Sequence, residues 1–374
     1  MKKELLLIMP ALFIGGAEKQ YRYIMEALSR DFQVTVLLLN IPLIGQEANT
    51  DKYIKEHSEI SFYQLSGDAI NGGAKGGIFE KIEKIKTLVK QYLWIKKYLK
   101  EHVVYATMFS YVTQLLLVPV FKSHKVRVVF NERNTGRQIC DRKYKIALLK
   151  KCDKVISNSK CAAMFIHDKT SIDVEVYNNG IEIKEIEHIC HNSFNIVVPA
   201  RINRIKNQMV VVDALLQLKD MLSTEDYNNI HCTLAGGIQD EEYSLEIKNK
   251  IELHNLNISM PGFVSEMNKI YEETDLLILP SFEEGTPNVL LEAYMNGIPA
   301  LVSDIPMNRD CCITTDILFD QTNPYELATK INLWITDKMV NDKKSYDECN
   351  YNFLITNYSM KTLKERYVCL FAHI

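Results

Sequence analysis

The chain has 374 residues, more than one hydrophobic core usually supports, so we expect two domains. Its 47% hydrophobic and 24% charged residues are typical of a globular protein and exclude a disordered or fibrous one. A net charge of −3 excludes a strongly basic protein, so we expect no nucleic-acid partner. The nine cysteines never form C-x-x-C, which favours a reducing, cytoplasmic compartment over a disulfide framework or structural zinc.

The first residues, 1–17, allow two interpretations. Lysines followed by apolar and small residues are typical of a secretory signal peptide. Glu4 and Pro10 interrupt that pattern, and residues 17–29 follow at helical period. We therefore expect a buried strand, a glycine loop and a helix here. No uncharged apolar run elsewhere is long enough to span a membrane.

Short apolar runs alternate with helical patterns, which predicts βα units around parallel sheets. The strands have continuous rather than alternating apolarity, so both faces of each sheet should be covered. In the first half we predict strands at 5–10, 33–40, 60–65, 103–108, 126–131 and 154–159, and helices at 17–29, 79–100, 111–121 and 140–151. In the second half we predict strands at 194–200, 230–236, 258–263, 276–281 and 299–304.

The polar, irregular segment 176–193 predicts a hinge. The expected fold is α/β, with two Rossmann-like parallel-sheet domains facing a central cleft. We place a first domain at 1–185, a second domain at 186–350, and a last helix at 351–374 that packs back on the first domain. The glycine-rich segment 66–77 predicts a mobile loop.

The stretch PSFEEGTPNVLLEAYMNGIPAL (280–301) holds two glutamates, Glu284 and Glu292, eight positions apart. Thr286 and Pro287, which follow Glu284, are a suitable N-cap and first residue for a helix that contains Glu292. The free N–H groups of the first turn of this helix could donate hydrogen bonds to phosphate oxygens. A ligand lying across this turn could then place a sugar hydroxyl at the first acid and a ribose at the second. The alternative is that both acids are ordinary surface residues.

These residues resemble the E-x7-E signature of the family 4 (group 1) retaining glycosyltransferases, which have the GT-B fold. The resemblance is to members that build bacterial surface polysaccharides. Further motifs match in the family's order, namely FIGGAEKQ (13–20), DKVISNSK (153–160), VYNNGIE (176–182), VVPARINRIKNQ (197–208) and MPGFVSEMNKIYEETDLLILPS (260–281).

The resemblance implies that 1–185 is the acceptor-side domain and 186–350 the nucleotide-sugar-binding domain. It also implies a role for each matching residue. Arg201 and Lys206 would clamp the diphosphate of a nucleotide-sugar donor, where negative charge grows as the sugar leaves. With Glu284 these two are the candidate catalytic residues; Arg204 is a third nearby cation, and the sequence does not decide which two point inward. The candidate donor-binding set is Gly16, Arg201, Lys206, Glu284, Gly285, Thr286, Asn288, Val289 and Glu292.

The candidate acceptor-side residues are Gly15, Gly16, Glu132 and Arg133. The two glycines would let the backbone approach a ligand closely. Many family members have a histidine after the strand at 126–131, whereas this chain reads NERN. Glu132 could contact a sugar or acceptor, Arg133 could be the inward residue, or the two could form a structural pair.

The resemblance implies an enzyme that needs neither a metal nor another cofactor. The sequence agrees, because D-x-D, H-E-x-x-H and clustered His/Cys ligands are lacking. The donor would be a nucleotide sugar, with UDP as the base guess, and the acceptor a glycan or polyprenyl-linked glycan for capsule or lipopolysaccharide. Two alternatives remain, a nucleotide-sugar epimerase of the same fold and a non-catalytic partner subunit.

The predicted helix 79–100 is unusually basic, with seven lysines and one glutamate between 81 and 100. Apolar residues recur along it at helical spacing, at Ile82, Ile85, Val89, Tyr92, Leu93 and Leu99. One interpretation is a basic face on an anionic membrane, which would make the enzyme peripheral to the inner side of that membrane. The other is an amphipathic helix packed on its sheet with solvated lysines.

Overall fold

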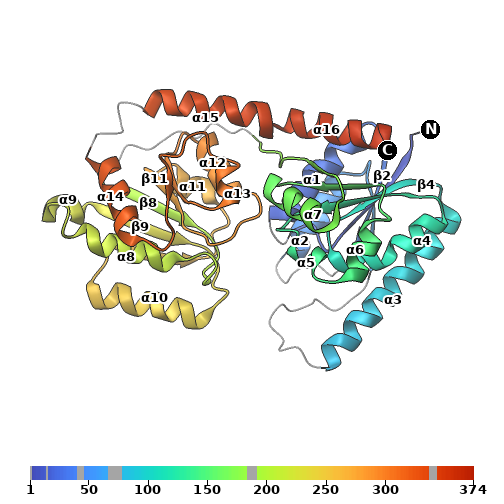
Figure 1. The fold of residues 1–374 in the computed structure, drawn as a ribbon, viewed down its shortest axis with the longest axis horizontal. Helices are drawn as coiled ribbons and strands as arrows, with labels where there is room; N and C mark the ends of the chain where they lie inside the picture. The colour runs from blue at the N-terminus through green and yellow to red at the C-terminus, as the bar shows by residue number, and fades with distance from the viewer. Residues whose placement is uncertain (1, 14–15, 40–45, 66–77, 183–191, 337–342) are drawn as a thin grey trace. The chain divides into compact units, whose positions relative to one another are not determined.

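The computed structural model describes residues 2–13, 16–39, 46–65, 78–182, 192–336 and 343–374. They form two compact units (Figure 1). Unit 1 comprises Met1–Gly180 together with Met360–Ile374, and unit 2 comprises Ile181–Ser359. Each unit contains one parallel sheet with helices around it.

The sheet of unit 1 has seven strands in the order β3-β2-β1-β4-β5-β6-β7. The central strand β1 pairs in parallel with β2 from Glu4↔Gln33 to Met9↔Leu38, and on its other edge with β4. The strands are β1 (Glu4–Met9), β2 (Gln33–Leu38), β3 (Ser61–Gln64), β4 (Val104–Phe109), β5 (Arg127–Glu132), β6 (Lys154–Ser157) and β7 (Val174–Val176).

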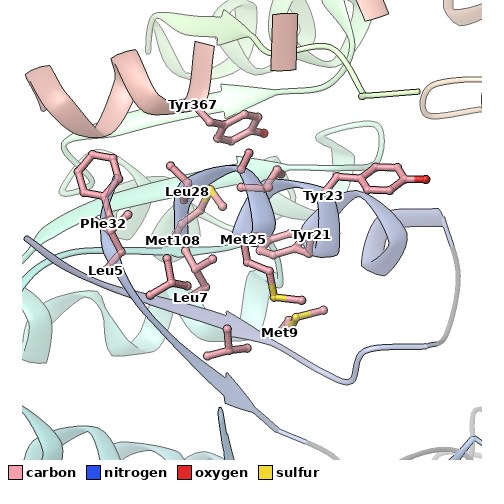
Figure 2. Packing of buried hydrophobic residues seen from close by; sticks show 14 of the residues in the cluster. Leu5, Leu7, Met9, Tyr21, Tyr23, Met25, Leu28, Phe32, Met108 and Tyr367 are labelled. Atoms are coloured by element: carbon pink, nitrogen blue, oxygen red, sulfur yellow. The ribbon is translucent and has the colours of Figure 1, made fainter. Parts of the chain in front are cut away.

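Both faces of this sheet are covered, as the continuous apolarity of its strands predicts. Leu5 and Leu7 of β1 belong to one core cluster, while Leu6 and Ile8 belong to a second cluster on the opposite face. Figure 2 shows the first cluster, in which the sheet meets Leu28 and other residues of α1 (Gly16–Ser29). The last helix α16 (Met360–His373) packs beside α1 and contributes residues such as Tyr367 to this layer.

The second face of the sheet is covered by α3 (Ile78–Glu101) and by the segment after β4. The other helices of unit 1 are α2 (Glu47–Glu56), the 3-10 helix η1 (Val112–Leu117), α4 (Val118–Ser123), α5 (Arg137–Cys140), α6 (Lys143–Leu149) and α7 (Lys160–Thr170).

The sheet of unit 2 has six strands in the order β10-β9-β8-β11-β12-β13. Its strands are β8 (Phe194–Pro199), β9 (Ile230–Ala235), β10 (Ile258–Gly262), β11 (Leu276–Leu279), β12 (Ala300–Ser303) and β13 (Leu318–Phe319). One face packs on α8 and α14 and the other on α12 and α15. The helices are α8 (Gln208–Leu218), α9 (Thr224–Asn228), α10 (Glu241–His254), α11 (Met267–Tyr271), α12 (Asn288–Met295), α13 (Pro306–Arg309), α14 (Pro324–Ile335) and α15 (Lys343–Tyr358).

All eleven predicted strands are present, and β1 followed by α1 confirms a folded first segment. The prediction of one continuous last helix is wrong, because α15 ends at Tyr358 and only α16 belongs to unit 1. Ser359 between the two helices forms a parallel bridge with Ile181. The predicted boundary at 185, the loop at 66–77 and Gly15 lie outside the described residues. No helix in the described ranges combines the length and apolarity needed to cross a membrane.

Candidate functional site

The order of strands in unit 2 locates a ligand-binding position at the edge of its sheet. Strand β8 lies between β9 and β11, so the chain leaves β8 toward one side and later returns to its other side. Ligands of open parallel sheets bind at such a switch point, beyond the carboxyl ends of the strands. The loops that follow β8, β9 and β11 meet at this position.

Backbone hydrogen bonds hold these loops together. The Ile202 N–H donates to Gly237 O at 3.0 Å, and the Phe282 N–H donates to Ile205 O at 2.8 Å. Gly236 allows this close approach, because a Cβ atom at that position would lie 1.9 Å from Ala200 O. The loop after β8 is therefore fixed on both sides. We did not predict Gly236 from the sequence, although the Gly-Gly pair directly after β9 was a signal for it.

Lys206 and Glu284 form an ion pair across the switch point, with 2.6 Å between Nζ and Oε1. Their side chains are only 19% and 10% exposed. Asn207 adopts a left-handed conformation at the start of α8, with φ of 53°, and its amide donates to Pro280 O and Gln321 O. This arrangement places a cation and a carboxylate at the end of adjacent strands β8 and β11.

The two arginines of the same loop have different surroundings. Arg201 is exposed and takes part in no ion pair within the described chain, while its carbonyl is held by Gln208 Nε2 at 2.9 Å. Arg204 is bound to Glu246 of α10, with 2.6 Å between Nη2 and Oε1, and lies over the Tyr243 ring. Arg204 is thus engaged in a surface ion pair, whereas Arg201 is exposed. Which of these cations contacts a ligand stays a prediction.

Helix α12 begins one residue later than the sequence predicts. Pro287 rather than Thr286 occupies the N-cap position, because its ψ of 76° is not helical while its carbonyl accepts the N–H of Leu290. Glu292 is the fifth residue of α12, a little more than one turn from its start, and is half-buried. The Tyr271 hydroxyl donates to Glu292 Oε2 at 3.0 Å. Burial and the nearby carboxylate raise the pKa of Tyr271 well above its usual range, so this hydroxyl stays a donor.

The remaining predicted donor residues divide between the two units. Gly285, Thr286, Asn288 and Val289 are half-buried around the start of α12, on the same loop and helix as Glu284 and Glu292. Gly16, in contrast, is the exposed first residue of α1 in unit 1. No three His, Cys, Asp or Glu side chains in the described ranges are grouped to hold a metal ion.

Glu132 is the last residue of β5 in unit 1 and Arg133 follows it; both are buried. The Glu132 carboxylate accepts the N–H of Asn134 at 2.7 Å, so it stabilises its own loop. Burial raises the pKa of Glu132, and backbone N–H groups and Arg133 only partly offset this effect. Arg133 donates from Nη2 to Asn179 Oδ1 at 2.6 Å, and its Nε is buried with no hydrogen-bond partner. Which of the two residues contacts a ligand stays a prediction.

Sequence reasoning missed a further group of polar side chains in unit 1, which lies at the switch point of its sheet between β1 and β4. Glu18 of the first turn of α1 is buried and accepts a hydrogen bond from the Tyr111 hydroxyl at 2.9 Å. Beside it, the Tyr21 hydroxyl and Ser110 Oγ are 2.5 Å apart. The signal was an acid three residues after Gly15 and polar residues directly after β4.

Comparison with known proteins identifies the C-terminal unit. A family model described as Glycosyl transferases group 1 matches residues 181–353, almost all of unit 2. These residues form a group 1 glycosyltransferase domain. The resemblance found in the sequence is thereby confirmed at the level of group 1, and so is the enzyme class. Membership of family 4 within that group remains a prediction.

Two curated relatives of this glycosyltransferase are similar in sequence. The capsular polysaccharide biosynthesis glycosyltransferase CapH of Staphylococcus aureus is 28% identical over 51% of this chain and 52% of that protein. An α-1,4-N-acetyl-D-galactosaminyltransferase of Campylobacter jejuni, named for a diNAcBac-PP-undecaprenol-linked substrate, is 22% identical over 98% of both chains. Similarity to the second relative therefore extends across both units.

The fold of the glycosyltransferase also matches solved structures. Anabaena HepE in complex with UDP and glucose superposes with a TM-score of 0.78 over 100% of each chain, at 14% identity. At this identity the likeness concerns the fold alone. It confirms the predicted class, a GT-B protein of two Rossmann-like parallel-sheet domains.

Proposed function

We propose that this glycosyltransferase moves a sugar from a UDP-sugar to a hydroxyl group of a glycan or lipid-linked glycan, with retention at the anomeric carbon. The observation that carries the proposal is the Lys206–Glu284 ion pair, with Arg201 exposed in the same loop. A cation and an acid at one switch point suit a nucleotide sugar, because the cation can bind its diphosphate and the acid can bind its sugar hydroxyls.

The proposed reaction breaks the bond between the anomeric carbon and the β-phosphate oxygen and forms a bond from that carbon to the acceptor oxygen. The acceptor proton passes to the leaving phosphate on the same face of the sugar. Negative charge grows on the diphosphate in the transition state, where Arg201 and Lys206 stabilise it. The backbone of the loop that carries these two cations is bonded on both sides, which limits how far the loop must reorganise.

Helix α12 supports the donor's position. Its N-terminal end carries partial positive charge and directs N–H groups toward anions, which suits the diphosphate. In this arrangement Glu284 orients the sugar by accepting hydrogen bonds from its hydroxyl groups, and Glu292 does the same for the ribose. Gly285 and Val289 would contact the donor through their backbone, and Thr286 and Asn288 through polar side chains.

The choice of UDP and of the acceptor rests on the neighbours' names. HepE is described in complex with UDP and glucose, and the two curated relatives are named for capsular polysaccharide and for an undecaprenol-linked substrate. We therefore extend the proposal to bacterial surface polysaccharide synthesis. A lipid-linked acceptor would lie in a membrane, so we include peripheral attachment of the enzyme through helix 79–100.

The acceptor side of the proposal lies in unit 1. Arg133, with its unpartnered buried Nε, and the Glu18–Tyr111 pair would hold acceptor hydroxyls. Gly16, and with it Gly15, would leave room for the donor phosphates or the acceptor at the first turn of α1. Tyr111 is 42% exposed, so its ring is accessible to a ligand.

The proposal is tested by thermal unfolding with a panel of nucleoside diphosphates and their sugars. A ligand at about a hundred times its dissociation constant stabilises a protein by about 2.7 kcal/mol, a shift that a melting scan resolves. We expect UDP and a UDP-sugar to stabilise the wild type, and Arg201→Ala to lose most of this effect. Arg204→Ala is the matched control, because it removes the same charge from an arginine already bound to Glu246.

If another nucleotide stabilises the protein instead, the base is corrected and the clamp is retained. If none does, the donor site is not functional in the free chain, and a non-catalytic partner subunit becomes the better explanation. An epimerase would bind the same donor but would form a second nucleotide sugar in the absence of any acceptor.

A further inference from the structure

The turn that carries Glu284 is bonded on one side to the loop after β8. The Asn207 amide donates to Pro280 O at 3.2 Å, and the Phe282 N–H donates to a carbonyl of that loop at 2.8 Å. Buried backbone groups that follow a strand need such partners, because the ladder of the sheet no longer supplies them. Ser281, the residue between these two contacts, is held from elsewhere.

Ser281 is held by the end of β12, on the other side of β11. Its carbonyl accepts a hydrogen bond from the Ser303 hydroxyl at 2.6 Å. Ser303 is the last residue of β12, and both serines are 0% exposed. Strand β11 lies between β8 and β12 in the sheet. The turn before Glu284 is therefore bonded to the neighbours of β11 on both sides.

Asn308 fixes the direction of the hydrogen bond from Ser303. Its Nδ2 lies 2.9 Å from Ser303 O and 3.0 Å from Ser303 Oγ. A carbonyl only accepts, so the amide nitrogen of Asn308 must face both atoms and donate to them. The Ser303 hydroxyl hydrogen is thereby left for the Ser281 carbonyl. Asn308 lies on the short helix α13 and is also fully buried. We call Asn308, Ser303 and Ser281 the β12 relay.

The β12 relay is poorly explained as a source of stability. A hydroxyl and an amide lose their hydrogen bonds to water on burial, so a bonded pair adds little net stability. Residues 300–302, which precede Ser303 in β12, are apolar and buried, so this strand otherwise contributes core. The polar side chains at its end instead fix a piece of backbone, and that backbone reaches Glu284 three residues later.

We propose that Ser303 and Asn308 are positioning residues for the donor sugar, which act by holding the turn that presents Glu284. Neither side chain touches the ligand, because both are fully buried. The proposal rests on the proposed function, in which Glu284 binds the sugar hydroxyls and Arg201 and Lys206 bind the diphosphate. Loss of the relay should therefore weaken the binding of a UDP-sugar and spare the binding of UDP, which has no transferred sugar to orient.

Titration calorimetry of UDP and of a UDP-sugar tests the positioning role without any turnover. The UDP-sugar is the one that the wild type binds most tightly among UDP-glucose, UDP-galactose and their N-acetylamino forms. For Ser303→Ala we expect the Kd of the UDP-sugar to rise roughly tenfold, the effect of one hydrogen bond to a charged group, while the Kd of UDP changes by less than about twofold. A purely structural role would not change the ratio of these two constants.

Two further variants of the relay separate the hydroxyl from its orientation. Ser303→Thr keeps the hydroxyl and should bind both ligands like the wild type. Asn308→Ala removes the donor to Ser303 and should change the two constants in the same pattern as Ser303→Ala, with a smaller loss. Ser244→Ala is the matched control, because Ser244 is buried in unit 2 as Ser303 is but lies on α10, outside the relay.

Action through Glu284 is tested by adding Ser303→Ala to Glu284→Gln. The double variant should bind the UDP-sugar no more than about twofold more weakly than Glu284→Gln alone, because the second change can only displace a side chain that is already altered. A further tenfold loss in the double variant would show that Ser303 acts independently of Glu284 and would overturn the proposal.

Equal behaviour of Ser303→Ala and Ser244→Ala, when the wild type binds both ligands, overturns the positioning role and leaves the proposed function intact. Equal losses of UDP and UDP-sugar binding in Ser303→Ala overturn it as well, because a general loss of structure affects both. A wild type that binds neither ligand overturns the proposed function, and the positioning role with it. Melting curves confirm that each variant is folded, and Asn308→Ala decides the question if Ser303→Ala does not fold.

Discussion

Lys206 and Glu284 are 78 residues apart in the sequence, yet their side chains form a 2.6 Å ion pair at the ends of β8 and β11. The pair connects the basic loop of the group 1 domain to the first acid of its E-x7-E segment. In the free enzyme it orients both side chains toward the position where we expect the diphosphate and the donor sugar to meet.

We expect Lys206→Ala to lower kcat/KM by about a hundredfold or more, because one charge contact to the leaving phosphate is lost. Glu284→Gln should cause a loss of similar size while the loop stays in place. Steady-state kinetics of both single variants and the double variant measure their coupling, which should exceed about 0.5 kcal/mol. Lys219→Ala is the control, because it removes an exposed lysine at the C-terminal end of α8, whereas Lys206 precedes the start of that helix. A loss no larger than in this control would contradict the role of Lys206.

Tyr271→Phe removes the hydroxyl that donates to Glu292 and leaves the ring in its buried position. We expect KM for the donor to rise severalfold, in line with about 1 kcal/mol for one hydrogen bond, and kcat to stay nearly unchanged. The reason is that the ribose lies away from the bond that breaks. Tyr227→Phe, on α9 of the same unit, is the control. A fall in kcat with unchanged KM would contradict a ribose contact for Glu292.

Much of the fold follows from the sequence because buried parallel strands have a distinctive composition. The continuous apolar runs around Leu5 and Ile196 are found in strands covered on both faces, and every predicted strand is present. Strands β7 and β13 were missed, since three and two residues are too few to give a pattern. The spacing of Glu284 and Glu292 also indicated the site, because a strand, a turn and a helix fix where each acid lies.

Other features depend on tertiary contacts that periodicity does not encode. The apolar residues of α3 recur at helical spacing, but the pattern does not say that Leu93 faces solvent while Leu99 is buried. Glu132 is an acid at the end of a strand like Glu284, yet it binds the N–H of Asn134. Helix α15 ends at Tyr358, directly before Ser359, which forms a bridge with Ile181, 178 positions away in the sequence.

Gly236→Ala tests the close approach of the loops after β8 and β9. The added methyl group would lie 1.9 Å from Ala200 O, so the backbone carrying Arg201 must shift. We expect a loss of stability of about 1–3 kcal/mol and a large loss of donor binding. Gly237→Ala is the matched control, because its methyl group would meet nothing closer than 3.8 Å. Both are measured by thermal unfolding with and without UDP. Equal behaviour of the two variants would contradict a requirement for glycine at position 236.

Asp153→Asn gives a pH-dependent prediction for unit 1. Burial tends to raise the pKa of this carboxyl, but hydrogen bonds from Lys122, the Val128 N–H and Arg127 outweigh it and hold the pKa below its usual value. A carboxyl with a lowered folded pKa stabilises the protein above its unfolded pKa of about 3.9, and that contribution disappears as the pH falls through the folded pKa.

The variant should therefore be less stable than the wild type by about 1–3 kcal/mol at neutral pH. The difference should shrink below about pH 4 and approach a small constant in stronger acid, because the wild-type carboxyl is then neutral as well. Urea unfolding at a series of pH values measures it. Asp304→Asn is the control, since the exposed pair of Asp304 with Arg309 is screened by solvent. A wild-type advantage that persists unchanged in acid would show that packing, and not the charge of Asp153, is responsible.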